Sequence, residues 1–349
     1  MSESRVTAAA EKSTPIAVVG VSALFPGALT TASFWQDILA GRDRLTDVPR
    51  THWLAGDYFD PRPGTPDKVC TTRGGFLSGV DFDPLEFGLP PNIAQATDTA
   101  QLLSLIVAKR ALAEATRGRF ESIDRSRISV VLGVASATEL VAHMSGRLQI
   151  PVAQRAMRAA GLDEADIARV SEVLAGCYVP WQESTFPGLL GNVVAGRIAN
   201  RLDLGGTNTV VDAACASSLA AVDIAANELA LGRADLVLTG GVDTLNDILM
   251  FMCFAQTGAL SPTGDCRPFS DDSDGTMLGE GIGIVALKRL EDAERDGDAI
   301  YAVIRGVGTS SDGRSKSIYA PAPEGQARAL ERAYARAGYG PETVELVEA

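Results

Sequence analysis

The stretch Thr207–Gly232, TNTVVDAACASSLAAVDIAANELALG, changes from one kind of secondary structure to another at Cys215. The β-branched residues Thr209–Val211 follow the turn pair Gly205-Gly206 and predict a strand. After Cys215 the chain is rich in Ala and Leu, with few polar residues, until Gly232 offers a C-terminal cap. The pattern predicts a cysteine at the turn between a strand and the N-terminus of a buried helix.

The predicted position of Cys215 allows two interpretations. The N-terminus of a helix carries partial positive charge and unpaired N–H groups, which favour a thiolate and can hold a developing oxyanion. A free cysteine is also among the most buried residue types, so Cys215 could equally be a small core residue. The strand–cysteine–helix pattern alone leaves both interpretations open.

Strands and helices alternate along the rest of the chain. Apolar, β-branched runs predict strands at Pro15–Ser22, Arg127–Val134, Leu236–Gly240, Ile282–Leu290, Tyr301–Gly308 and Val344–Val347. Helical spacing of apolar residues predicts helices at Gln95–Ala115, Leu140–Leu148, Glu164–Leu174, Asn192–Leu202 and Glu324–Ala337. This alternation predicts an α/β protein with largely parallel, buried sheets. The rhythm restarts near residue 299, which suggests a second, incomplete half.

Composition excludes several classes of protein. The 349 residues are 46% hydrophobic and 21% charged, as in globular proteins, and the net charge of −13 argues against nucleic-acid binding. We expect no membrane span, because no apolar run approaches about 18 residues, and interpret residues 1–13 as a flexible lead-in. The five cysteines (70, 177, 215, 253 and 266) are scattered, which argues against disulfides and a zinc site and favours a cytoplasmic location.

A glycine-rich segment and the two histidines are further candidates for functional motifs. Gly279–Gly283 lacks the G-x-G-x-x-G spacing and leads into a strand, so we expect no bound nucleotide cofactor, and no metal site is predicted. His52 and His143 are the only histidines. Nothing in their local sequence directs either ring to Cys215, so both are interpreted as surface or packing residues.

Five segments carry a family resemblance. Asp212-Ala-Ala-Cys-Ala-Ser-Ser218 resembles the nucleophile motif of the β-ketoacyl synthases, the condensing enzymes of fatty-acid and polyketide assembly. Pro15–Ser22 resembles their opening strand, and Asn192–Asn200 resembles the helix before the nucleophile strand. Gly258–Ser270 and Asp274–Gly283 resemble the signature loop and strand of type I systems. The resemblance covers nearly the whole chain.

Other segments resemble one branch of that family. Trp53–Pro61, Pro66–Lys68 and Phe82–Asn92 are similar to iterative synthases of the polyunsaturated-fatty-acid, heterocyst-glycolipid and enediyne type. Ser310–Gly313 together with Ile318–Pro321 supports the same branch.

The resemblance implies a thiolase-like, five-layer αβαβα fold in which two similar halves stack. Residues 14–298 would form the first half, with the nucleophile, and residues 299–349 would begin the second half, which is incomplete. The family works as a homodimer, in which the strand near Thr207–Asp212 would pair across the dimer axis. No cofactor would be bound directly.

The implied reaction is a decarboxylative Claisen condensation. Cys215 would take an acyl chain as a thioester from the phosphopantetheine of an acyl carrier protein, with its own backbone N–H as one oxyanion donor. A malonyl unit on the carrier protein would then lose CO2 and attack that thioester. In the family two histidines follow the cysteine, the first directly after a strand like Val344–Ala349. We therefore expect these 349 residues to lack both catalytic histidines and to be inactive in condensation.

Two alternatives remain. A thiolase-fold acyltransferase without decarboxylation would need a second cysteine as base, and neither Cys253 nor Cys266 lies in such a motif. A non-catalytic partner of the chain-length-factor type would lack the nucleophile, so the presence of Cys215 argues against it.

Overall fold

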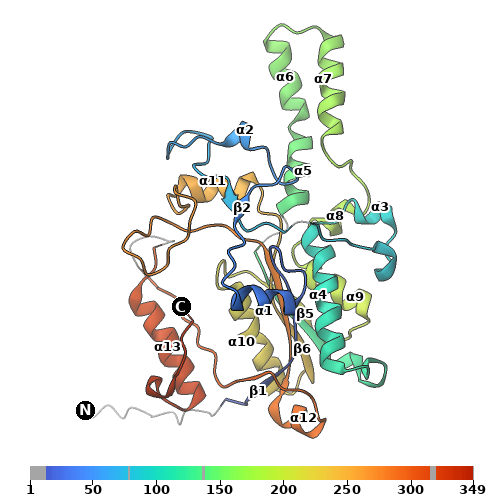
Figure 1. Cartoon of the computed structure of the whole chain (residues 1–349). Helices are drawn as coiled ribbons and strands as arrows, with labels where there is room; N and C mark the ends of the chain where they lie inside the picture. Colours follow the sequence, from blue (N-terminus) through green and yellow to red (C-terminus); the bar gives the residue numbers. More distant parts are fainter. Residues whose placement is uncertain (1–12, 78, 136–137, 315–319, 349) are drawn as a thin grey trace, which may run out of the picture.

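The computed structural model describes residues 13–77, 79–135, 138–314 and 320–348. A sheet lies at its centre, with helices on either side (Figure 1). This sheet has six strands in the order β5-β4-β6-β7-β1-β8. The strands are β1 (Ile16–Leu24), β4 (Ile128–Val134), β5 (Asn208–Val211), β6 (Leu236–Asp243), β7 (Gly281–Arg289) and β8 (Ala302–Ile304). The predicted lead-in lies outside the described residues up to residue 12, as do Ile318, Tyr319 and Ala349.

Helices cover both faces of this sheet. α4 (Thr99–Thr116) and α9 (Val193–Leu202) pack on one face, and α10 (Ser217–Ala230) packs on the other. Side chains alternate between these faces: Leu132 of β4 belongs to the core beneath α4, whereas Val131 belongs to the core beneath α10. Because both faces are buried, the strands have the continuous apolar sequences from which they were predicted.

The prediction of a largely parallel sheet is wrong. β4 runs parallel to β5 and β6, but β7 is antiparallel to both β6 and β1, and β8 is antiparallel to β1. The connection from β6 to β7 contains α11 (Ile248–Gln256), whose Phe251 packs with Trp53 and Phe76 in a separate core cluster. This connection does not cross back over a face of the sheet, so β7 returns in the opposite direction.

The predicted helices are confirmed within a few residues, but several others were not predicted, including α11 and α12 (Leu290–Arg295). α5 (Thr138–Leu148), α7 (Glu164–Gly176) and α13 (Pro323–Ala337) match the expected positions. α6 (Ile150–Ala159) was missed because Pro151 resembles a helix breaker, although proline is tolerated in the first turn. Figure 1 shows α6 and α7 projecting together beyond the end of the sheet. Among the described helices, none is long and apolar enough to cross a membrane.

Two other predictions need correction. Val344–Val347 follows a short 3-10 helix, η4 (Pro341–Thr343), and forms no strand, since no neighbouring strand in the described part of the chain pairs with it. α10 is not buried all round. It buries Ser217, Ala221, Ala225 and Leu229 against the sheet and exposes the larger side chains Leu219 and Ile224 on its other sides. Apolar residues lie on all sides of α10, so the sequence pattern did not show that only the side facing the sheet is packed against other residues.

Asp98 joins α4 to α5 and provides a test of the fold. Its carboxylate caps α4 by accepting a hydrogen bond from the Ala100 N–H, at 3.0 Å, and another from the Leu140 N–H, at 3.2 Å. Burial raises its pKa to about 6, and the charge of Glu139 acts in the same direction. The folded protein therefore binds this proton more tightly than the unfolded chain, and the stabilisation is lost as pH rises from about 4 through 6.

We expect Asp98→Asn to remove this pH dependence. A difference of about two pKa units between the folded and unfolded states corresponds to about 3 kcal/mol. Between pH 4 and 7 the native protein should therefore lose up to about 3 kcal/mol more of its unfolding free energy than Asp98→Asn does. Urea unfolding of both proteins across this range measures the difference. Parallel curves for the two proteins would contradict the assignment.

Candidate active site

Cys215 lies in the tight turn between β5 and α10, as predicted. Ala214, directly before it, has φ +50°, a left-handed conformation that alanine adopts only under strain. Ser217 holds the turn: its hydroxyl oxygen accepts a hydrogen bond from the Ala213 N–H at 2.8 Å, and its hydroxyl donates to the Ala214 carbonyl at 2.6 Å. Asp212 accepts a further bond from the Ala214 N–H at 3.0 Å. These contacts fix the backbone on both sides of the thiol.

The thiol is accessible. Cys215 is exposed, which decides against a core residue, and in the described part of the chain its backbone N–H has no hydrogen-bond acceptor. α10 begins two residues later, so the first N–H groups of the helix lie close by. A carbonyl oxygen that gains negative charge beside this sulfur would find a donor already in place.

Cys215 lines a cavity of about 530 Å³, and several glycines of the neighbouring strands line it as well. Gly133 of β4 and Gly241 of β6 lie beneath the first turn of α10. A Cβ on Gly133 would lie 2.4 Å from the carbonyl carbon of Ser217, and one on Gly241 would lie 2.9 Å from the Ser218 Cβ. These glycines let the start of α10 approach the sheet and bring the thiol to its edge. The sequence shows glycines at these strand ends, but not what they contact.

Glu280 also lines this cavity, and its carboxylate is fully occupied. Oε1 accepts a hydrogen bond from the Asn246 N–H at 2.7 Å and meets Nε2 of His52 at 2.8 Å, while Oε2 accepts from the Leu77 N–H at 2.7 Å. The side chains of Glu280 and His52 are 1% and 3% exposed. Glu280, directly before β7, is thereby connected to three segments, which contain His52, Leu77 and Asn246. Neither the role of Glu280 nor that of His52 in this contact was predicted from the sequence.

The two histidines are not part of the wall around Cys215. His52 turns toward Glu280, so the alternative of a surface position is wrong, and the ring also packs edge-on against Phe76. His143 packs against the ring of Tyr178, with 6.1 Å between ring centroids, as expected for a packing residue. Within the described residues, no histidine lines the Cys215 cavity.

The other cysteines lie elsewhere. Cys70 is partly buried, and burial raises the pKa of its thiol. Cys177, Cys253 and Cys266 are exposed, and none of these cysteines is among the residues that line the Cys215 cavity. The described site therefore contains one thiol.

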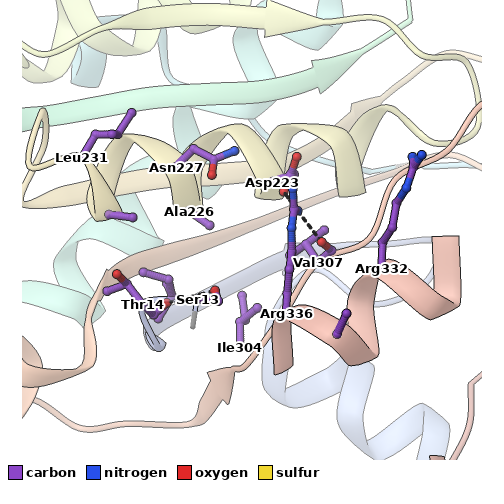
Figure 2. A pocket seen from close by; sticks show the side chains of 14 residues that line it. Ser13, Thr14, Asp223, Ala226, Asn227, Leu231, Ile304, Val307, Arg332 and Arg336 are labelled. Carbon is purple, nitrogen blue, oxygen red and sulfur yellow. Dashed lines mark hydrogen bonds and ion pairs between the residues drawn. The ribbon is translucent and has the colours of Figure 1, made fainter. Parts of the chain in front are cut away.

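A larger cavity, of about 740 Å³, separates α10 from α13 and does not include Cys215. Figure 2 shows Arg336 of α13 reaching toward Asp223 of α10, and the two form an ion pair of 2.9 Å. Arg336 also donates to the carbonyl of Val307. These contacts hold α13 beside α10 at a distance from the thiol.

Comparisons with known proteins agree with this arrangement. The family model "Beta-ketoacyl synthase, N-terminal domain" matches residues 13–293, and "Beta-ketoacyl synthase, C-terminal domain" matches residues 301–349. A polyunsaturated fatty acid synthase subunit of Thraustochytrium sp. is 42% identical over 338 residues, which are 97% of this chain and 12% of that protein. A mycocerosic acid synthase-like polyketide synthase of Mycolicibacterium smegmatis is 34% identical, over 96% of this chain and 14% of that protein.

Solved structures give the same result. The ketosynthase from module 6 of the bacillaene synthase of Bacillus subtilis is 28% identical with a TM-score of 0.77, over 95% of this chain and 50% of that chain. An oxazolomycin ketosynthase domain of Streptomyces albus has a TM-score of 0.76 at 28% identity, over 95% of this chain and 51% of that chain. The chain thus spans about half of these ketosynthases and a small part of the curated synthases. The thiolase-like fold and the family matches establish that the chain belongs to the β-ketoacyl synthases, as a ketosynthase domain of the kind found in type I polyketide and polyunsaturated fatty acid synthases.

Proposed function

We propose that Cys215 is the nucleophile of a decarboxylative Claisen condensation. Its sulfur would attack the thioester of an acyl group on the phosphopantetheine of an acyl carrier protein and keep the acyl chain. A malonyl unit on the carrier protein would then lose CO2, and its carbanion would attack the acyl-cysteine. The observation that carries this proposal is the exposed Cys215 on a strained turn, with a backbone N–H that no described residue accepts.

The two alternatives receive less support. A chain-length-factor partner needs no accessible thiol at this turn, whereas Cys215 is exposed and faces a cavity. A non-decarboxylating thiolase-type enzyme needs a second cysteine beside the first, and no other described cysteine lines that cavity.

We also propose the remaining features of the assembly. Residues 14–298 form the half that carries the nucleophile, and residues 299–349 begin the second half. A homodimer would form through β5, which lies at the edge of the sheet and pairs only with β4 in the described structure. The identity of 42% to the polyunsaturated fatty acid synthase favours that branch. No cofactor would be bound directly, and the five free thiols fit a cytoplasmic location.

The test is to replace Cys215 in a complete synthase that contains this domain. Cys215→Ala should lower condensation by about 1,000-fold or more, because no covalent acyl-enzyme can form. Cys253→Ala is the matched control, since this exposed cysteine lies outside the cavity, and it should leave the rate unchanged. Condensation that survives in Cys215→Ala would overturn the proposal.

A polypeptide of residues 1–349 separates the two halves of the reaction. It should accept an acyl group on Cys215 but release no CO2 from malonyl carrier protein, because no described histidine lines the cavity. Mass spectrometry of the protein and release of labelled CO2 measure the two steps.

A further inference from the structure

Asp243, the last residue of β6, lines the same cavity as Cys215. Side chains alternate along a strand, and Val242 belongs to the core beneath α4. Gly241 faces the opposite way, toward Ser218 in the first turn of α10. Asp243 therefore lies on the face of the sheet that α10 covers. It is two residues beyond Gly241, at the C-terminal end of β6, on the side of the sheet where the Cys215 cavity lies.

Among the described residues that line this cavity, only Asp243 and Glu280 have charged side chains. Both carboxylate oxygens of Glu280 are already occupied, by two backbone N–H groups and by His52. The backbone of Asp243 pairs with Gly281 of β7, but its carboxylate has no hydrogen-bond partner among the described residues. Of the two described acidic groups in the cavity wall, Asp243 is thus the one whose carboxylate is not already hydrogen-bonded within the protein.

We propose that Asp243 is the proton acceptor for Cys215 during acyl transfer. This inference rests on the proposed function and names a second reacting group for its first step. The carboxylate takes the proton of the Cys215 thiol as the sulfur attacks the carbonyl carbon of the acyl thioester. The bond from that carbon to the carrier sulfur then breaks, and the protonated Asp243 returns the proton to the departing thiolate. No oxidant or further reactant is needed, and the proton ends on the carrier thiol.

The surroundings of Asp243 suit this role. Asp243 as a residue is exposed to the cavity. Partial burial of its carboxylate still raises the pKa of Asp243 to about 6, and the negative charge of Glu280 acts in the same direction. A base with this pKa is ionised at pH 7 and still accepts a proton readily. Around it, the end of β4 contributes no charged side chain, the segment directly before β7 contributes Glu280 with His52 behind it, and the turn before α10 contributes Cys215.

Asp243→Asn tests the inference on the 349-residue protein. The probe is an acetyl thioester of N-acetylcysteamine, and the readout is the single-turnover rate at which Cys215 is acetylated between pH 5 and 9. The native rate should rise with an apparent pKa near 6. The variant should lose this limb and react about 100-fold more slowly at pH 7. Asp272→Asn, which changes an exposed loop carboxylate, should behave as the native protein does.

A second measurement separates catalysis from folding. Alkylation of Cys215 by iodoacetamide at pH 9.5 needs no protein base, so it should stay within about twofold of the native rate in Asp243→Asn. Equal acetylation rates of native and variant at pH 7, or a parallel loss of alkylation, would overturn the role of Asp243. Acetylation that persists in Cys215→Ala would instead overturn the nucleophile itself, so the two proposals fail by different results.

Discussion

Gly133→Ala is expected to lower the free energy of unfolding by about 3 kcal/mol and to displace Cys215. The added methyl group would lie 2.4 Å from the Ser217 carbonyl carbon, 2.5 Å from the Ser218 nitrogen and 2.6 Å from the Ser217 carbonyl oxygen. All three atoms belong to the backbone of α10, so no side chain can rotate away. Either β4 or the first turn of α10 must move, and overpacking of this kind costs about 1–3 kcal/mol or more.

Gly279→Ala is the matched control for this substitution. Gly279 lines the same cavity, but no atom lies within 4 Å of the position that an added Cβ would take, and its φ is not positive. Urea unfolding should show little change for Gly279→Ala and a large loss for Gly133→Ala, accompanied by slower alkylation of Cys215. A Gly133→Ala protein with native stability and native alkylation would show that α10 does not depend on this close approach.

The sequence predicts the central part of this site because the signal there is local. The β-branched run before Cys215 favours a strand and the Ala-rich run after it favours a helix, so the turn between the two must fall at Cys215. The direction of β7 is different, since it depends on where the chain from Leu245 to Glu280 packs. That information lies in contacts such as Phe251 with Trp53, which no local pattern reveals.

The same distinction separates the predicted site residue from those that were missed. Cys215 stands in a recognisable motif, whereas Asp243 at the end of β6 and Glu280 just before β7 are brought together by the pairing of those two strands. Gly133 can be read from the sequence, but the reason why a side chain would not fit there is the short distance to Ser217, which only the structure shows. A strand ending in consecutive glycines, as at Gly240-Gly241, is the one sequence signal that could have indicated a close approach of another backbone.

Glu280→Ala is expected to be the second large effect, with a loss of about 3–5 kcal/mol in the free energy of unfolding. Removing one partner of a buried polar contact leaves the others without acceptors, and here they are the N–H groups of Leu77 and Asn246 and the ring of His52. The loss should affect these loops before it affects the whole protein, because His52, Leu77 and Asn246 lie outside the strands of the central sheet.

Hydrogen exchange tests this directly. The amides of Leu77 and Asn246 should exchange faster in Glu280→Ala, while those of Val130 and Leu238 in the central strands should change only with global stability. His52→Gln is the matched control, because glutamine keeps a donor for Glu280 and leaves both backbone bonds in place; it should cost only about 1 kcal/mol. If Glu280→Ala left the exchange of Leu77 and Asn246 unchanged, the carboxylate would not be what holds these segments against the wall of the Cys215 cavity.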